Sequence, residues 1–219
     1  MGVNVIEMRG AGVRFGERYA VRDASFEVGD REICALLGPV GSGKTTLLEL
    51  ASGIRRPTSG EVRVRGADPY QDRAELRTGI VWREGGLFPG LTVAEVVDTW
   101  RRWTVDPLSR DDALRLTGLG DFEDVLFERL SPCGQRMLDL ALALVRGSDV
   151  LFLDEPSAGL DDVAARQVWS VLRRLAGDGV TILLATRHPH EARYADRIVV
   201  LEEGRLAATR ASVPAHRAA

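Results

Sequence analysis

Lysine is almost absent from the sequence, although basic residues are not. Of the 29 basic residues among 219, all are arginine except Lys44, which lies in the stretch GPVGSGKTT. A compact ammonium group can enter a ring of phosphate oxygens from which a broad, planar guanidinium is excluded. The scarcity of lysine therefore indicates that position 44 requires the ammonium group itself, and it directs attention to this stretch.

The sequence also has few cysteines, no long apolar run and no excess of positive charge. Each of these features argues against a class of protein. Cys34 and Cys133, the two cysteines, provide neither a disulfide framework nor a metal-binding spacing, so we expect a reducing cytosol. No apolar run reaches the ~18 residues of a membrane span. The opening MGVNVIEMRG lacks the pattern of a signal peptide. The net charge of -3 argues against a general nucleic-acid-binding protein, so no nucleic-acid partner is expected.

What the sequence does have is a large apolar content, 45%, arranged in alternating strand-like and helical runs. The β-rich runs are NVIEMRG, GVRF, ASFEV and GEVRVRG. The runs typical of buried parallel strands are EICALLG, DVLFLD and VTILLAT, and a short helix and a last strand-like run, DRIVVLEEGRL, follow them. Helical patterns occupy KTTLLELASGI, TVAEVVDTWRRW, SRDDALRLTGL (with Ser109 as N-cap) and residues 162–176.

This order predicts an α/β fold: a parallel sheet with flanking helices, an N-terminal antiparallel β region and a helical insertion. The predicted core comprises residues 1–85 and 148–210, the helical insertion residues 86–147, and a frayed tail residues 211–219. The sequence contains no internal repeat and no linker, so we expect these parts to form one unit.

The stretch GPVGSGKTT, called the P-loop below, follows a predicted strand and opens a predicted helix. This context makes the pattern G-x-x-x-x-G-K-T specific for phosphate binding, because glycines let backbone N–H groups converge on phosphate oxygens at a helix N-terminus. Lys44 is expected to bridge the β- and γ-phosphates of ATP and Thr45 to hold Mg²⁺. The expected nucleotide-binding residues of the P-loop are Gly38, Pro39, Val40, Gly41, Ser42, Gly43, Lys44, Thr45 and Thr46. A glycine-rich turn without a ligand is the alternative.

Two further motifs lie in the second half of the sequence. VLFLDEP ends an apolar run in two acids, of which Asp154 fits a Mg²⁺ partner and Glu155 the base that polarises the attacking water. Their alternative is a pair of solvated acids at a strand end. LSPCG, called the signature turn below (residues 130–134), precedes an apolar helix, where Ser131 is a possible ordinary N-cap with Pro132 at the first helical position.

With these motifs in place, the sequence resembles the ATP-binding subunits of ABC transporters, especially the drug-exporter ATPases of the daunorubicin-resistance kind. The resemblance extends from about Val3 to Thr209 and includes GLFPGLTVAEVV and LDLALALVRGSDVLFLDEPSAGLD. It implies a P-loop NTPase core and a peripheral location on the cytoplasmic face of the cell membrane, bound to a separate membrane-spanning permease. It also implies a homo- or heterodimer in which ATP lies between one P-loop and the partner's Ser-Gly-Gly-Gln signature.

The sequence departs from that family at several site positions. In the signature turn, Pro132 has no N–H group, and Cys133 carries a side chain where the family has glycine. Ser131 and Cys133 are still expected to face the partner's nucleotide. Phe15 matches the aromatic residue on which the family stacks adenine, with plain core packing as the alternative.

Two more departures fall on the P-loop side. Arg83 stands where the family has the glutamine that ligates Mg²⁺ and water, and Arg187 stands where it has the switch histidine. His188 comes one residue late, and strand alternation predicts that it points the other way. Both arginines either are solvated or direct a guanidinium at the γ-phosphate.

Three functions are therefore open. The chain is the ATP-hydrolysing subunit of a membrane transporter, with export favoured and turnover slowed by the altered residues. Alternatively, it is a catalytically weak nucleotide-holding partner in a heterodimer. The third hypothesis, a soluble ABC ATPase acting on DNA or ribosomes, is disfavoured because such proteins usually carry tandem cassettes or long inserted arms. ATP and Mg²⁺ are the expected ligands in each case.

Overall fold

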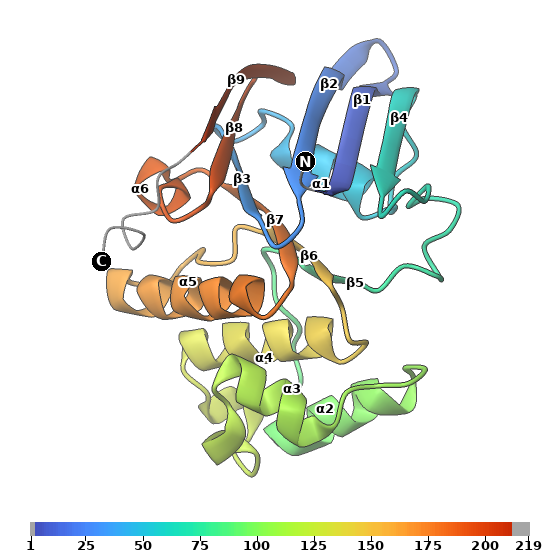
Figure 1. The fold of residues 1–219 in the computed structure, drawn as a ribbon. Coiled ribbons are helices and arrows are strands. Elements are labelled where there is room, and N and C mark those ends of the chain that lie inside the picture. Colours follow the sequence, from blue (N-terminus) through green and yellow to red (C-terminus); the bar gives the residue numbers. More distant parts are fainter. Residues whose placement is uncertain (1–2, 212–219) are drawn as a thin grey trace.

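The computed structural model of the protein describes residues 3–211, which form two β-sheets with helices around them (Figure 1). One sheet is antiparallel and has the order β2-β1-β4. Its strands are β1 (Asn4–Phe15), β2 (Arg18–Gly29) and β4 (Ser59–Val64). The predicted antiparallel β region is thus confirmed, although NVIEMRG and GVRF belong to one strand whose register shifts between Met8 and Ala11.

The other sheet has the order β5-β6-β7-β3-β8-β9 and is parallel except for its last strand. Its strands are β3 (Ile33–Leu37), β5 (Thr78–Val81), β6 (Val150–Asp154), β7 (Thr181–Thr186), β8 (Arg197–Glu202) and β9 (Arg205–Ala211). The predicted α/β fold with a parallel sheet is confirmed.

The helices divide between the two faces of the parallel sheet, as Figure 1 shows. Helix α1 lies between the two sheets, whereas the long helices α4 and α5 lie on the opposite side together with α2 and α3. The helices are α1 (Lys44–Ala51), α2 (Val93–Arg102), α3 (Arg110–Thr117), α4 (Pro132–Leu144), α5 (Asp162–Gly177) and α6 (Pro189–Ala192), with 3-10 turns at Gly120–Phe122 and Phe127–Arg129. As predicted, the Ser109 hydroxyl caps α3, accepting from the N–H of Asp112.

The core consists of two apolar layers separated by the parallel sheet. Ile33 and Ala35 of β3 pack in the layer that contains α4 and α5, whereas Cys34 and Leu36 pack in the layer that contains α1. Because successive side chains of a strand point to opposite faces, a strand covered on both faces must be apolar throughout. This explains the uninterrupted apolar run EICALLG and fixes the carboxyl end of β3 next to the P-loop.

Two elements differ from the expectations. The sequence analysis did not predict β5, and DRIVVLEEGRL forms two strands joined by a tight turn in which Glu203 and Gly204 both have positive φ, 47° and 78°. Ala211 belongs to β9, and the rest of the predicted frayed tail lies outside the described residues. Within residues 3–211, no helix combines the length and the hydropathy that a membrane span requires. The limits proposed for the helical insertion stay a prediction.

Candidate functional site

The P-loop connects β3 to α1, and its glycines are required by close approaches of the backbone. A Cβ atom on Gly38 would lie 2.3 Å from the carbonyl oxygen of Leu201, and one on Gly43 would lie 2.6 Å from that of Ala20. Gly43 also has φ 102°, a conformation that L-residues with side chains avoid. The loop is thus held against the β8–β9 turn and the start of β2, with the first turn of α1 opening from it.

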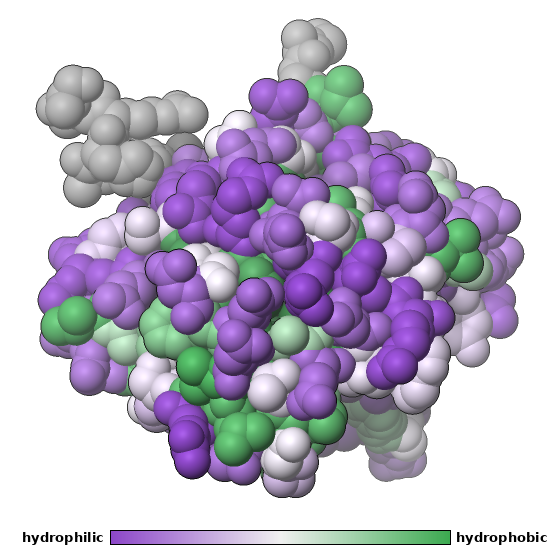
Figure 2. Space-filling view, turned by 90° about the horizontal axis from the view of Figure 1, so that it is seen from below, coloured by the Kyte–Doolittle hydropathy of each residue, from purple (hydrophilic) through white to green (hydrophobic). Residues whose placement is uncertain are grey.

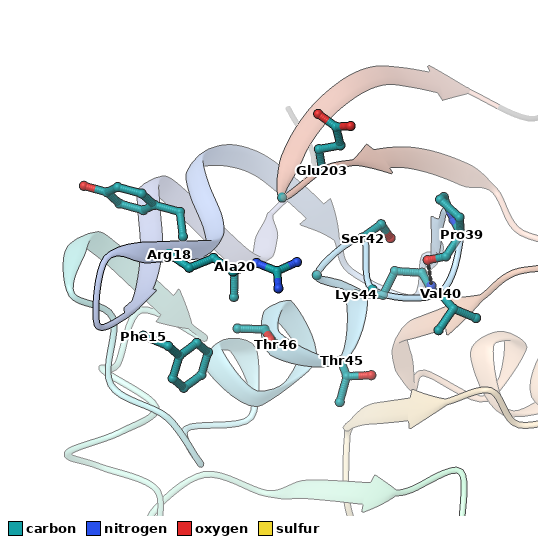
Figure 3. A pocket seen from close by; sticks show the side chains of 14 residues that line it. Phe15, Arg18, Ala20, Pro39, Val40, Ser42, Lys44, Thr45, Thr46 and Glu203 are labelled. Carbon is teal, nitrogen blue, oxygen red and sulfur yellow. Dashed lines mark hydrogen bonds between the residues drawn. The ribbon is translucent and has the colours of Figure 1, made fainter.

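Lys44 is buried, and its ammonium group is held by the P-loop itself. Nζ donates to the carbonyl oxygen of Gly38 at 2.9 Å. It also donates to that of Pro39 at 2.8 Å, a bond that Figure 3 shows. Burial lowers the pKa of Lys44, while the nearby carboxylates of Glu155 and Asp154 oppose this effect. The only lysine of the chain therefore lies where its charge is available to the phosphate-binding loop.

The P-loop meets the end of β6 through Thr45. Its hydroxyl donates to Asp154 Oδ2 at 2.8 Å, which brings two oxygen ligands of the kind Mg²⁺ prefers next to each other. The hydroxyl of Ser42 is buried without a hydrogen-bond partner among the described residues. A buried polar atom left unpaired is costly, and a phosphate oxygen is a suitable acceptor for it. The residues present therefore fit a Mg²⁺–nucleotide complex.

Asp154 and Glu155 are both buried, at 7% exposure each, which excludes the alternative of two solvated acids. Burial raises the pKa of Asp154, and the hydrogen bond from Thr45 and the charges of Lys44 and Arg83 partly offset it. Glu155 has φ 50°, unusual for a residue with a side chain, and its N–H donates to the carbonyl of Ala185 in β7 at 2.9 Å. Strained residues of this kind cluster at functional sites.

Arg187 directs its guanidinium at Glu155, with 3.9 Å between Nε and Oε2 and with 40% of its side chain exposed. It is therefore not simply a solvated surface residue. The same Nε donates to His188 Nε2 at 3.2 Å. The expectation that His188 points the other way was wrong, because β7 ends at Thr186 and strand alternation does not extend to these residues.

Arg83 lies just beyond the end of β5, and its side chain is exposed. Its charge nevertheless reaches the site, since it lowers the pKa of Asp154 against the larger effect of burial. The main chain of Arg83 is bonded to helix α4: its carbonyl oxygen accepts a hydrogen bond from Arg136 Nη2 at 2.7 Å.

A cavity of about 690 Å³ extends from the P-loop to the tip of the β1–β2 hairpin. Phe15 lines it and is 51% exposed, so the alternative of plain core packing is wrong. The guanidinium of Arg55 covers one ring face of Phe15 at 4.7 Å from the centroid. Figure 3 shows Phe15 at one end of the cavity, Lys44 at the other, and the Arg18 guanidinium pointing into it.

The signature turn contributes no residue to this cavity. Ser131 is the N-cap of α4, its hydroxyl accepting from the N–H of Gly134 at 3.1 Å, with Pro132 at the first position. Cys133 is partly buried against α5, where its Sγ lies 3.3 Å from Gln167 Oε1. Burial, and to a smaller extent the charge of Asp161, raises the pKa of its thiol. The predicted N-cap is thus confirmed, and the two candidate half-sites use separate parts of one chain.

Several residues of this region were missed by the sequence analysis. Glu191 of α6 is buried and accepts from Ser157 Oγ at 2.6 Å and Thr186 Oγ1 at 3.2 Å, linking the segments after β6 and β7. Arg18 and Glu203 line the cavity, but only the fold brings them there. Arg136 gave one signal, since a charged residue within a mostly apolar helix requires a partner.

The fold and the P-loop together define a P-loop nucleotide-binding protein, and comparisons identify its family. A family model described as ABC transporter matches residues 21–158. "Nod factor export ATP-binding protein I" of Burkholderia lata is 38% identical over an alignment 219 positions long. The alignment covers 94% of this chain and 70% of that protein. "Daunorubicin resistance ATP-binding protein DrrA3" of Streptomyces coeruleorubidus is 33% identical over 216 residues, covering 95% and 68%.

Solved structures agree in fold. The cassette cbiO1 of Clostridium perfringens, part of the ABC transporter complex cbiONQ, has a TM-score of 0.83 at 25% identity, covering 94% of this chain and 88% of that one. The bacterial ABC transporter cassette MJ0796, in a dimeric structure, has a TM-score of 0.78 at 24% identity, covering 94% and 98%. The chain belongs to the ATP-binding proteins of the ABC transporter family, as its motifs predicted.

Proposed function

We propose that the chain is the ATP-binding subunit of an ABC-type membrane exporter and that it binds Mg-ATP in the cavity between Lys44 and Phe15. The observation that carries the proposal is one cavity lined by the buried Lys44, by Thr45, whose hydroxyl bonds to Asp154, and by the exposed ring of Phe15. Export is favoured because the names of several relatives refer to export or resistance.

In this proposal the P-loop amides and Lys44 hold the phosphates, while Phe15 stacks on the base. Glu155 accepts a proton from the attacking water, for which its buried position beside the phosphate-binding loop is suitable. Thr45, with Asp154 nearby, would hold Mg²⁺, which when bound would neutralise charge on the phosphate oxygens. The partner subunit's signature turn completes the site.

We further propose that turnover is slow. Arg187, at the position of the family's switch histidine, carries a permanent positive charge and forms an ion pair with Glu155, the proposed base. In the signature turn, the missing N–H of Pro132 removes one donor to the partner's γ-phosphate. Losing one preorganised transition-state contact costs about 2.7–4 kcal/mol, or about 10²–10³ in rate. The same ion pair favours the second candidate function, a nucleotide-holding partner in a heterodimer.

The helical end of the molecule supports the proposal of a membrane-protein partner. Large apolar side chains are exposed there, with Leu87 at 83%, Trp103 at 82% and Val105 at 90%. Beside them a cavity of about 450 Å³ is lined by aromatic residues that include Phe88 and Trp100. Figure 2, a view from below, shows hydrophobic patches within a mostly hydrophilic face. A permease surface of apolar side chains is suited to cover such a surface.

The test is a thermal shift with Mg-ATP. At a nucleotide concentration of about 100 Kd, binding to the native state adds about 2.7 kcal/mol. This corresponds to an increase in Tm of about 5–10 °C for a domain of this size. Lys44→Ala should remove the shift, whereas Arg115→Ala, which changes an exposed ion pair on α3, should keep it. If Lys44→Ala retains the full shift, the nucleotide binds elsewhere and the proposal fails.

A further inference from the structure

One face of the exposed Phe15 ring is covered by an arginine that lies outside the nucleotide cavity. The guanidinium carbon of Arg55 is 4.7 Å from the ring centroid, within the ~6 Å at which a cation is attracted to an aromatic face. Phe15 lines the cavity of about 690 Å³, whereas Arg55 lines a separate depression of about 170 Å³. The face that Arg55 covers is therefore turned away from the cavity, and the opposite face is open to a base.

Arg55 is itself held in place by helix α1. Its Nε donates to Glu49 Oε2 at 2.5 Å, and both side chains are only partly exposed, at 33% for Arg55 and 22% for Glu49. The N–H of Arg55 also donates to the carbonyl oxygen of Glu49 at 3.0 Å. One residue of the helix thus binds both the main chain and the guanidinium of Arg55, which leaves the cation few alternative positions.

The same helix reaches the opposite end of the cavity. Lys44, the first residue of α1, and Thr45 line the cavity at the end away from Phe15 (Figure 3). Glu49 follows Lys44 by five residues, or about one and a half helical turns. Helix α1 therefore holds Lys44 at its start and, through Glu49 and Arg55, the ring of Phe15 near its end. The two ends of the cavity are linked by one rigid element.

The ring of Phe15 is otherwise only half covered, because it stands at the tip of the β1–β2 hairpin. Phe15 ends β1 and pairs with Arg18 across a turn in which Gly16 has φ 59°. About half of the residue, 51%, is exposed. An exposed side chain keeps rotamer freedom that binding must remove, at a cost in affinity. A contact that holds the ring in advance lowers this cost.

We propose that Arg55 is a positioning residue that holds the Phe15 ring for stacking on a base, and that it thereby raises the preference of the cavity for nucleotides over inorganic polyphosphate. The proposal rests on the proposed function for the identity of the ligand. The cation fixes the orientation of the ring and draws ring electron density towards its own side. The open face then attracts an electron-rich base more strongly. Arg55 itself does not contact the nucleotide.

Three other roles of Arg55 predict different results. If Arg55 only adds positive charge near the cavity, its loss weakens the binding of ATP and of tripolyphosphate equally. If the base has to displace Arg55 from the ring, its loss strengthens the binding of ATP. If the contacts of Arg55 with Glu49 and Phe15 serve only the fold, its loss lowers Tm and leaves both affinities unchanged. The comparison of a ligand that has a base with one that lacks it therefore separates these roles.

The experiment measures the Kd of Mg-ATP and of magnesium tripolyphosphate by calorimetric titration for wild type, Arg55→Ala, Phe15→Ala and the double variant. A cation over an exposed aromatic ring contributes about two- to fivefold to an equilibrium constant. We expect Arg55→Ala to weaken ATP binding by about this factor and to leave tripolyphosphate binding unchanged. In the Phe15→Ala background the same change should have no further effect on ATP, because Arg55 acts through the ring.

Arg56→Ala is the matched control. It removes the same charge from the next position of the same loop, where the side chain is exposed, and it should bind both ligands as wild type does. Arg55→Gln removes the cation but keeps part of the length and polarity of the side chain, so it keeps the test valid if Arg55→Ala does not fold. It should show the same selective loss of ATP affinity.

The outcomes are distinguishable. If wild type does not bind Mg-ATP, the proposed function fails and the role of Arg55 fails with it. If wild type binds ATP and folded Arg55→Ala binds it equally or more tightly, nucleotide binding stands and the role of Arg55 is overturned. An equal loss of tripolyphosphate affinity, or a further loss of ATP affinity in the Phe15→Ala background, also overturns it, because Arg55 then does not act through the ring.

Discussion

The two candidate half-sites of this chain differ in how much of their chemistry is intact. In the P-loop half-site, Lys44 and Thr45 line one cavity, Thr45 donates a hydrogen bond to Asp154, and the buried Ser42 hydroxyl has no partner among the described residues. In the signature half-site, Ser131 caps its own helix, while Pro132 lacks a donor and Cys133 contacts α5. This difference supports the proposal that holding a nucleotide and completing a partner's site are separable tasks, and that this chain is equipped mainly for the first.

The largest expected effect concerns assembly. With Glu155→Gln to block hydrolysis, Mg-ATP should convert the chain from monomer to dimer, alone or with a second ATP-binding subunit, because composite sites need two chains. Light scattering should show the mass doubling, and adding Lys44→Ala should abolish it. Pro132→Gly with Cys133→Gly should strengthen self-association by restoring the signature turn.

A result of monomer only, both alone and with candidate partners, would contradict the composite-site interpretation. Equal self-association with and without the restored signature turn would show that the two half-sites do not differ in the way proposed.

A smaller effect is expected at the base-binding end of the P-loop half-site. Phe15→Ala should weaken ATP binding by about 1–3 kcal/mol, or about 5–150-fold, which is the usual contribution of aromatic stacking to a base. Affinity for inorganic tripolyphosphate, which has no base, should not change. Tyr70→Ala, another exposed aromatic that does not line this cavity, serves as the matched control in calorimetric titrations. Equal losses for ATP and tripolyphosphate would show that Phe15 supports the loop instead of the base.

The smallest effect is a gain of stability without nucleotide. Since burial raises the pKa of Asp154, its contribution to stability is present at acid pH and is lost as pH rises through the folded-state pKa. Asp154→Asn should therefore raise the Tm of the nucleotide-free protein at pH 7. The difference should shrink as pH falls below that pKa and vanish below the pKa of Asp154 in the unfolded state. The same variant should reduce the Mg-ATP shift. A nucleotide-free Tm lower than wild type at pH 7 would mean that the carboxylate stabilises the fold.

Local rules were sufficient for much of the fold and for the P-loop. The glycines of that loop, the Ser109 cap and the doubly buried apolar strands follow from spacing and composition, and the structure has them at the expected residues. Strand β5 was not predicted because it has only four residues and includes Gly79. A Cβ atom at Gly79 would lie 2.3 Å from the carbonyl oxygen of Ala143. A glycine that is needed for close packing of α4 weakens the strand pattern in the sequence.

The site contacts that were missed depend on residues far apart in the chain. Arg136 bonds to Trp82 and Arg83 across more than fifty positions, and no local periodicity predicts which carbonyls a buried guanidinium meets. The expectation for His188 failed for a different reason, since it extended strand geometry beyond the end of β7. The sequence thus predicted which groups we expect to bind phosphate, and the fold was needed to find what positions them.

The most direct test of the central claim is the turnover number of the wild-type chain compared with that of Arg83→Gln combined with Arg187→His, measured with saturating Mg-ATP. The account predicts that wild type hydrolyses ATP far below the typical enzyme rate of about 10 per second. It also predicts that the double change raises kcat, because Glu155 is released from its ion pair with Arg187, and that Glu155→Gln abolishes activity in either background. A wild-type rate near the typical value that falls in the double variant would contradict the account. The two arginines would then stabilise the γ-phosphate charge in the transition state.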